Sequence, residues 1–231
     1  MPTKDDIILI ADPRVLAIPL RHNTEPLVDL RQQTSIVYGP SPEIPDNQDY
    51  TFVRQTIYDK LLTAQQQLPN GYHFCLYEGY RSLALQKLIF DERYGKVQTR
   101  YPTWSSDQIF LETIKLVSPV INQDGSDNVP PHATGAAIDV YLLDDAGQAL
   151  DMGIHPEDWM MDVSGAKSLT DSKEISETAI KNRRLMSDVL TAVGFVNYPT
   201  EYWHWSYGDR YWAFMTKAPQ TLYDLANHSS K

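Results

Sequence analysis

The stretch that decides the fold is PPHATGAAIDVYLL, residues 130–143. Its second half is apolar except for one residue and is bounded by turn signals, a pattern typical of a buried strand over 136–143. The turn that closes the strand is DDAG, residues 144–147. Helical patterns dominate the earlier part of the chain and short aromatic runs end it. This order predicts an α+β fold with a central antiparallel sheet flanked by helices.

One charged residue interrupts the predicted strand. Asp139 stands in an apolar run, and a buried carboxylate is costly unless a metal, an arginine or several hydrogen-bond donors accompany it. His132 lies seven residues earlier, which puts the two side chains on opposite faces of a straight strand. Gly135 between them can adopt a turn or bulge that restores the phase. One interpretation is that both residues are zinc ligands. The alternative is that Asp139 caps a segment or pairs with an arginine, and that His132 is only a loop residue.

A second pairing of an acid with an imidazole lies in EYWHW, residues 201–205. Glu201 and His204 share a face on a helical turn, whereas on a strand they need a bend. Aromatic neighbours lower the local dielectric and can raise the pKa of a carboxyl group toward the range useful in acid–base catalysis. The alternative interpretation is a strand with a polar edge.

Together these segments contain the parts of a hydrolytic zinc centre. His132, Asp139 and His204 offer three ligands, which leaves a fourth position for a water whose pKa falls to roughly 7. Glu201 can then take the proton of that water as general base. The single cysteine, Cys75, excludes a disulfide within the chain and a multi-cysteine metal site.

A third piece is EGYRS, residues 78–82, at a predicted junction between a strand and a helix. Arg81 in this position can reach into a cleft and hold an oxyanion or a carboxylate, although arginine at a helix start is often only a surface residue. We expect the zinc site in a cleft over the sheet.

The other elements follow from periodicity and from cap and turn residues. Ser82 and a capping box of Ser105 and Gln108 mark two helix starts, while Gly95 and Gly194 mark helix ends. Predicted helices span 49–68, 82 to about 93, a stretch from 105, and 174–193. In the last of these, the residues expected to face inward are Ile180, Leu185, Val189 and Val193. Predicted strands span 72–78, 195–198, 201–207 and 211–215.

Length and charge restrict the class of protein. The 231 residues predict a single domain, 1–231, in which 1–48 is an irregular N-terminal segment that wraps the core. A net charge of −10 argues against nucleic acid as a partner. The first thirty residues do not resemble a signal peptide, and no run approaches the ~18 apolar residues of a membrane helix. We expect a cytoplasmic protein without a membrane partner, and the oligomeric state is left open.

These pieces, in this order, resemble the D-alanyl-D-alanine dipeptidases of the VanX type, within the zinc D,D-peptidases of cell-wall peptidoglycan metabolism. The family pattern is G-Y-R, then S-x-H-x-x-G-x-A-x-D, then E-x-x-H. Residues 79–81 match the first motif, His132 through Asp139 the second, and Glu201 with His204 the third. The similarity covers most of the chain, from about residue 25 to 215.

The resemblance implies a hydrolase, a zinc metallopeptidase with one Zn²⁺ per chain that cuts a small free dipeptide such as D-Ala-D-Ala. It further implies a role for each motif residue: His132, Asp139 and His204 ligate zinc, Glu201 activates the zinc water and then protonates the leaving amine, and Arg81 stabilises the oxyanion. The family recognises the substrate ammonium with a carboxylate beyond the second motif. In the similar region here, residues 152–160, Asp158 is the first candidate and Glu157 the second; the alternative is that both are surface-loop residues.

Two positions depart from the family pattern. The family serine two residues before the first ligand is Pro130, which has neither a hydroxyl nor an N–H. A family tyrosine near Asp29 corresponds to Gln32. Both positions contact substrate in the family, so the substrate is either D-Ala-D-Ala or a related dipeptide. The same core residues also suit a zinc D,D-carboxypeptidase or amidase acting on longer cell-wall peptides, or a non-catalytic metal-binding module. Roles in glycopeptide resistance and in cell-wall recycling are both compatible with this chemistry.

Overall fold

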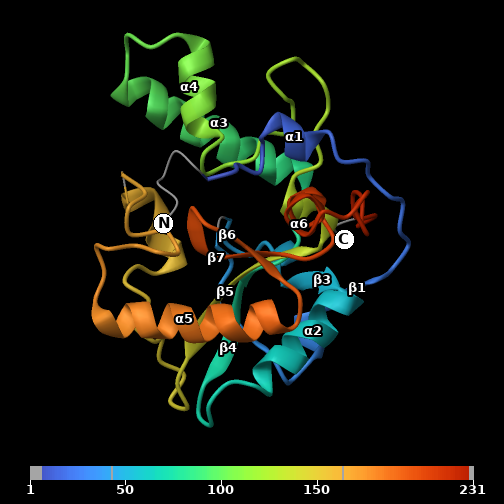
Figure 1. The fold of residues 1–231 in the computed structure, drawn as a ribbon, viewed down its shortest axis with the longest axis vertical. Helices are drawn as coiled ribbons and strands as arrows, with labels where there is room; N and C mark the ends of the chain where they lie inside the picture. The colour runs from blue at the N-terminus through green and yellow to red at the C-terminus, as the bar shows by residue number, and fades with distance from the viewer. Residues whose placement is uncertain (1–6, 43, 163, 229–231) are drawn as a thin grey trace.

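Five strands form the central sheet of the computed structural model, which describes residues 7–42, 44–162 and 164–228 (Figure 1). Their spatial order is β2-β4-β5-β7-β6, with the bounds Val37–Tyr38, His73–Glu78, Ala137–Leu143, Glu201–Ser206 and Val196–Tyr198 respectively. Neighbouring strands are antiparallel except β2 and β4, which are parallel. The predicted α+β fold with a central, mainly antiparallel sheet is confirmed, and the short parallel edge strand adds to it.

Strand β5 lies in the middle of this sheet and is buried along its whole length. On one face Ile138, Val140 and Leu142 pack in the main core, together with side chains of α2 (Gln55–Gln65) and α5 (Glu177–Ala192). Asp139 points to the opposite face because side chains alternate along a strand. Burial on both faces explains why β5 is apolar throughout except at this one position.

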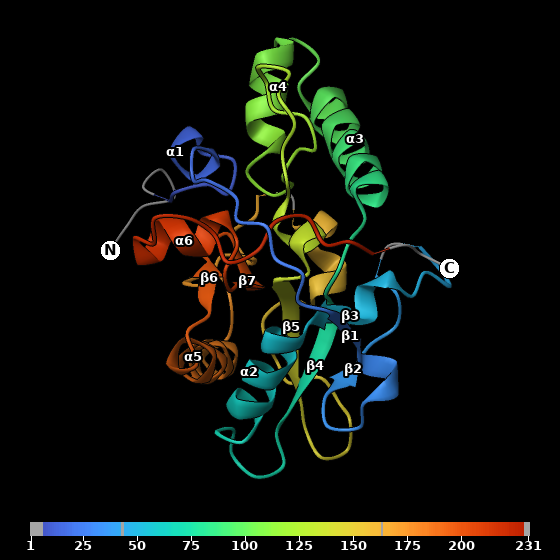
Figure 2. The ribbon, with the colours of Figure 1, turned by 90° about the vertical axis from the view of Figure 1, so that its right-hand side faces the viewer.

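A helical hairpin and several short helices lie on the side of the sheet that carries Asp139. The hairpin consists of α3 (Leu83–Arg100) and α4 (Ser106–Thr113), which pack on each other and project above the strands in Figure 2. The shorter elements are α1 (Pro13–Leu16), α6 (Arg210–Thr216) and the 3₁₀ helices η4 (Pro131–Thr134) and η5 (Pro156–Met161).

Both predicted helix starts of the hairpin are confirmed. The Ser82 hydroxyl accepts a hydrogen bond from the Leu85 N–H, and the capping box ahead of α4 is present. Helix α3 nevertheless runs through Gly95, the predicted end, to Arg100. A glycine inside a helix costs only about 1 kcal/mol. The residue before a proline is disfavoured in the helical region, and Pro102 accounts for the end of α3.

Two predicted elements are wrong in type. Residues 49–54 form the 3₁₀ helix η3 (Asp49–Thr51) and strand β3 (Phe52–Arg54) rather than the first turns of a helix. Strand β3 pairs antiparallel with β1 (Leu27–Asp29) in a separate two-stranded sheet, so tertiary pairing overrides the helical pattern. The aromatic run 211–215 lies in α6, because Asp209 caps that helix by accepting a hydrogen bond from the Trp212 N–H at 2.8 Å.

The longest predicted helix is present as α5, capped by Ser176 and followed by Gly194 with φ of 95°. Ile180 does not face inward as predicted, because its side chain is 43% exposed. The buried face instead includes Ala179 and Met186, so the inward stripe is displaced by one residue at the start of the helix.

The N-terminal segment predicted to be irregular contains short elements in its described part, and residues 1–6 lie outside the described residues. These elements are α1, β1, the 3₁₀ helix η2 (Leu30–Gln32) and β2. The segment packs against distant parts of the chain, for example Val15 against Tyr198 and Tyr211. No helix in the described part of the chain is long and apolar enough to cross a membrane.

Candidate active site

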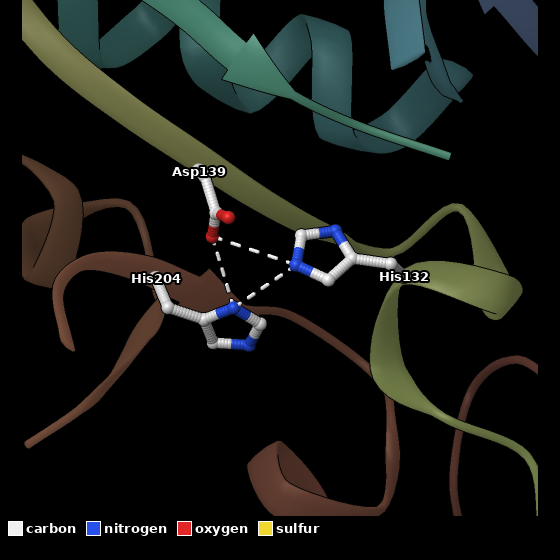
Figure 3. A group of neighbouring side chains, drawn as sticks. All are labelled: His132, Asp139 and His204. Carbon is white, nitrogen blue, oxygen red and sulfur yellow. Dashed lines mark hydrogen bonds and ion pairs between the residues drawn. The ribbon is translucent and has the colours of Figure 1, made fainter. Parts of the chain in front are cut away.

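Three side chains from neighbouring segments meet over the sheet, as Figure 3 shows. Asp139 lies in β5 directly opposite His204 of β7, and His132 lies in η4, which precedes β5. His204 Nδ1 is 3.0 Å from Asp139 Oδ1 and 3.1 Å from His132 Nε2. His132 Nε2 is 3.5 Å from Asp139 Oδ1. The structure therefore brings together the three residues predicted as zinc ligands.

Gly135 allows His132 and Asp139 to meet although seven residues separate them. It follows η4 in the left-handed conformation, with φ of 68°, which side chains other than hydrogen rarely allow. A Cβ atom at this position would lie 2.6 Å from Leu27 Cδ2. The chain turn predicted at Gly135 is therefore present, and it brings both ligands to the same face of the sheet.

A backbone carbonyl orients the first ligand. His132 Nδ1 lies 2.8 Å from the Gly79 oxygen; this oxygen can only accept, so Nδ1 carries the proton. In the neutral ring Nε2 then carries the lone pair that a metal needs, and it faces Asp139 and His204. Such a carbonyl partner is what typically fixes the tautomer and ring orientation of a metal-binding imidazole. Position 79 requires glycine because the chain there packs against β3, where a Cβ atom would lie 2.4 Å from the Phe52 oxygen.

The three ligand atoms fit a zinc ion. Tetrahedral bonds of about 2.0–2.1 Å place ligand atoms about 3.3 Å apart, and the separations here run from 3.0 to 3.5 Å. His132, Asp139 and His204 are all buried. Burial opposes ionisation of Asp139, but the two imidazoles outweigh it and lower the pKa of this carboxyl below its ordinary value. Asp139 thus has histidine partners, as a ligand set requires, and not the alternative arginine.

Glu201 stands beside this cluster at the first position of β7. Its Oε2 is 4.0 Å from His204 Nδ1. On a straight strand the two side chains would point to opposite faces. The pairing of β6 with β7 shifts register between Asn197 and Tyr198, which supplies the bend that the sequence spacing requires.

The surroundings of Glu201 favour its protonated form. Burial raises the pKa of this carboxyl well above its ordinary value, and the charge of Asp139 raises it further. Arg81 acts in the opposite direction, and Glu78 again raises the pKa. A buried acid with a raised pKa beside three ligand atoms is the environment that a proton-transferring group needs.

Arg81 follows β4 and precedes α3, and two buried side chains hold its guanidinium. Its Nε donates to Glu78 Oε1 at 2.8 Å, and its Nη2 donates to the other oxygen of the same carboxylate. Its Nη1 donates to Gln86 Oε1 at 3.0 Å, while Gln86 Nε2 donates to the Ser118 oxygen at 2.7 Å. The sequence motif included Glu78 without a role, and no local signal pointed to Gln86.

These groups share one cavity over the sheet. Its floor carries the three ligand residues, Glu201 and Arg81. Its walls also include a set of apolar residues from distant segments: Ile10, Ile89, Leu116, Val117, Trp159 and Trp203. The space that is open to water-sized molecules is about 50 Å³. The predicted cleft over the sheet is present and is narrow.

The predicted substrate-binding residues lie farther out. Asp158 and Glu157 are exposed residues of η5, and neither lines this cavity as the described residues define it, although their neighbour Trp159 does. Gln32 is exposed at the end of η2 and does not line the cavity either. Pro130 occupies the cap position of η4. A contact of Asp158, Glu157 or Gln32 with substrate stays a prediction.

Comparisons with known proteins place the chain in a peptidase family. Residues 44–225 match the model of the peptidase family M15, described as D-ala-D-ala dipeptidase. A D-alanyl-D-alanine dipeptidase of Synechocystis sp. is 26% identical over 224 residues, which cover 86% of this chain and 88% of that protein. One from Escherichia coli is 34% identical over 73 residues, or 32% of this chain and 35% of that protein.

Two solved structures show some similarity to this chain. One is VanYB in complex with D-alanine-D-alanine, with 18% identity and a TM-score of 0.44 over 88% of this chain and 93% of that one. The other is the LD-carboxypeptidase LdcB, with 19% identity and a TM-score of 0.43 over 96% of this chain and 90% of that one.

Proposed function

The chain belongs to the D-ala-D-ala dipeptidase family of peptidases, and from this premise we propose that it is a zinc dipeptidase that cleaves free D-alanyl-D-alanine or a related dipeptide. As a member of this family it is a hydrolase, a metallopeptidase of D-Ala-D-Ala or related peptides. The observation that carries the proposal is the convergence of three buried ligand atoms beside a carboxyl group whose pKa is raised.

We infer that one zinc ion per chain binds to His132 Nε2, Asp139 Oδ1 and His204 Nδ1. The separations of 3.0 to 3.5 Å between these atoms and their burial support this assignment. When bound, zinc supplies a Lewis acid for the peptide carbonyl and lowers the pKa of a water to roughly 7.

Glu201 is the proposed general base and general acid. Its carboxylate takes a proton from the attacking water and later delivers it to the nitrogen of the leaving amino acid. Both transfers are efficient only if the pKa of the carboxyl lies near the working pH. Burial raises the pKa of Glu201 in that direction, which supports this double role.

Arg81 is proposed to stabilise the negative charge that develops on the carbonyl oxygen. Donors aimed in advance at a developing charge stabilise a transition state without reorganising. Glu78 and Gln86 hold all three guanidinium nitrogens in place. Their contacts support a fixed Arg81 beside the cavity that it lines.

The substrate ammonium is proposed to bind Asp158, with Glu157 as second candidate and Gln32 as a further substrate contact. What supports the first two is their place on η5, beside Trp159, which lines the cavity. A cytoplasmic site of action is likewise a proposal, and cell fractionation would check it.

The test combines metal content with product release. The purified protein is expected to contain one equivalent of zinc and to release D-alanine from D-Ala-D-Ala. Glu201→Gln is expected to keep the zinc, because Glu201 is not a ligand, and to lose activity. A zinc-loaded protein that hydrolyses no free dipeptide would contradict the proposal.

Blocking the substrate amine separates this function from the alternative D,D-carboxypeptidase or amidase. A dipeptidase that binds the free ammonium loses affinity for N-acetyl-D-Ala-D-Ala, since a charged group is left without its partner. Equal turnover of the free and the acetylated dipeptide would favour the carboxypeptidase function.

A further inference from the structure

Residues 7–16, called the strap below, contribute one residue, Ile10, to the wall of the active-site cavity. Ile10 lines the catalytic cavity, whereas Ile7 and Leu9 line a second cavity of about 230 Å³. Leu116, which follows α4, lines both cavities. The strap and Leu116 therefore form part of a partition, and Ile10 is the strap side chain on the catalytic side.

The strap is anchored and does not rest loosely on the surface. Val15 is fully buried and packs with Tyr198 and Tyr211. The Asp12 N–H donates to the Leu9 oxygen at 3.0 Å. Helix α1 of the strap also contacts α6, and Ile8, Leu9 and Ile10 pack against the same cluster as Val15, so the strap is held against the folded core. Figure 2 shows α1 on the same side of the strands as α3 and α4.

The chemistry of this wall is that of a size filter. Ile10, Ile89, Leu116 and Val117 offer the substrate only aliphatic surface, which cannot orient a charged or polar group. Aliphatic surface distinguishes substrates only by the size and shape of the apolar groups that fit against it. The strap precedes residue 44, where the match to the dipeptidase family begins, so the family match does not include Ile10.

We infer that Ile10 is a specificity-determining residue that limits the size of the substrate side chain admitted to the catalytic cavity. The inference rests on the proposed dipeptidase function. Replacing Ile10 with alanine removes three carbon atoms from the partition and opens the narrow cavity toward neighbouring space. Apolar pockets discriminate by roughly 10- to 200-fold for each methylene group, which sets the scale of the expected change.

The experiment compares Ile10→Ala with Ile8→Ala in the full-length, zinc-loaded protein. Ile8 is the matched control, because it packs against the same cluster but lines neither cavity. The substrates are D-Ala-D-Ala, D-Ala-D-Leu and D-Leu-D-Ala. Ile10→Ala is expected to raise kcat/KM for at least one leucine dipeptide, relative to D-Ala-D-Ala, by about tenfold or more. Ile8→Ala is expected to leave both ratios within about twofold of the unaltered protein.

Leu116→Ala provides an independent route, because it opens the same partition from a different segment, and it is expected to change the same ratio. Dissociation constants of the three dipeptides, measured by calorimetry on each variant in a Glu201→Gln background, give a readout that does not need turnover. One outcome is that the proteins with intact Glu201 cleave none of the dipeptides, while the ratio of dissociation constants shifts in Ile10→Ala. That outcome would overturn the proposed function and support the role of Ile10 in limiting substrate size. Normal cleavage of D-Ala-D-Ala with ratios unchanged in both Ile10→Ala and Leu116→Ala would overturn the strap alone. No binding of any dipeptide would overturn both.

Discussion

The cavity has a metal side, which carries the proposed ligands His132, Asp139 and His204, and a proposed substrate side, which residues 152–169 form. Each side is supported by a buried arginine that binds backbone carbonyl oxygens. On the metal side, Arg54 Nε donates at 2.8 Å to the Thr134 oxygen, two residues after the ligand His132. On the substrate side, Arg183 donates to the oxygens of Met152, Lys167 and Leu169. These three carbonyls enclose the segment that carries Trp159 into the cavity.

The two sides differ in what else holds them. On the metal side, Asp139 and His204 are also paired in register between adjacent strands of the sheet. On the substrate side, the described residues between 152 and 169 contain only the 3₁₀ helix η5 as regular structure. The proposed ligands Asp139 and His204 therefore lie on sheet strands, while the proposed substrate contacts on η5 lie in a segment that can vary without disturbing those strands.

The largest expected effect comes from removing a ligand on the metal side. Asp139→Ala is expected to abolish stoichiometric zinc binding and to lower kcat/KM by roughly a thousandfold or more, since metal stabilisation of a transition state contributes several kcal/mol. Zinc content and D-alanine release measure both effects. Asp158→Ala is the comparison on the substrate side and is expected to keep full zinc content. Full activity of Asp139→Ala would remove the basis of the metal centre.

Exchanging the two arginines for lysine tests whether the two sides are independent. Lysine carries its donors on a single nitrogen and cannot reproduce the spread of the guanidinium fork over separate carbonyls, and each buried polar group left unpaired costs about 1–3 kcal/mol. Arg54→Lys is expected to lower zinc affinity, measured by competition with a chelator. Arg183→Lys is expected to raise KM more than it lowers kcat and to leave zinc affinity unchanged. Loss of zinc affinity in Arg183→Lys would show that the two sides are coupled.

Gly135→Ala tests how strictly the turn between the ligands is required. The φ of 68° and the clash with Leu27 predict a loss of about 1–3 kcal/mol of unfolding free energy, together with weaker zinc binding. The matched control is Gly125→Ala, where φ is 83° and a Cβ atom would meet nothing within 4 Å. Denaturant unfolding with and without zinc separates the two variants. Equal effects at both positions would mean that only backbone strain matters.

The smallest expected effect concerns an ion pair at the outer edge of the metal side. Burial opposes ionisation of Asp29, but hydrogen bonds from Arg31 and Thr51 outweigh it and lower the pKa of Asp29. The unfolded state binds the proton more tightly, so the stabilisation is complete above about pH 5 and is lost as the pH falls. We expect about 1 kcal/mol or less. The free energy of unfolding is measured from pH 6 to pH 3. It is expected to fall less steeply with decreasing pH in Asp29→Asn than in the unaltered protein.

Local patterns predicted the chemistry better than the element types. The sequence singles out His132, Asp139, His204 and Glu201 because a charged residue in an apolar or aromatic run has few inexpensive explanations, and the structure brings the first three together. Aromatic content predicts a strand over 211–215, yet the cap formed by Asp209 makes this run a helix. Periodicity predicts a helix that includes 52–54, yet pairing with β1 makes these residues a strand.

By itself, the sequence determined which side chains could hold a metal and which glycine must lie between them, because ligand chemistry and backbone conformation depend on residue type and close spacing. Tertiary structure alone decided that Gln86 holds Arg81, that Arg54 and Arg183 support the two sides of the cavity, and that Ile10 lines it. These contacts join segments far apart in the chain, and no periodicity records them. Their energy depends on distances that arise only when the core has packed.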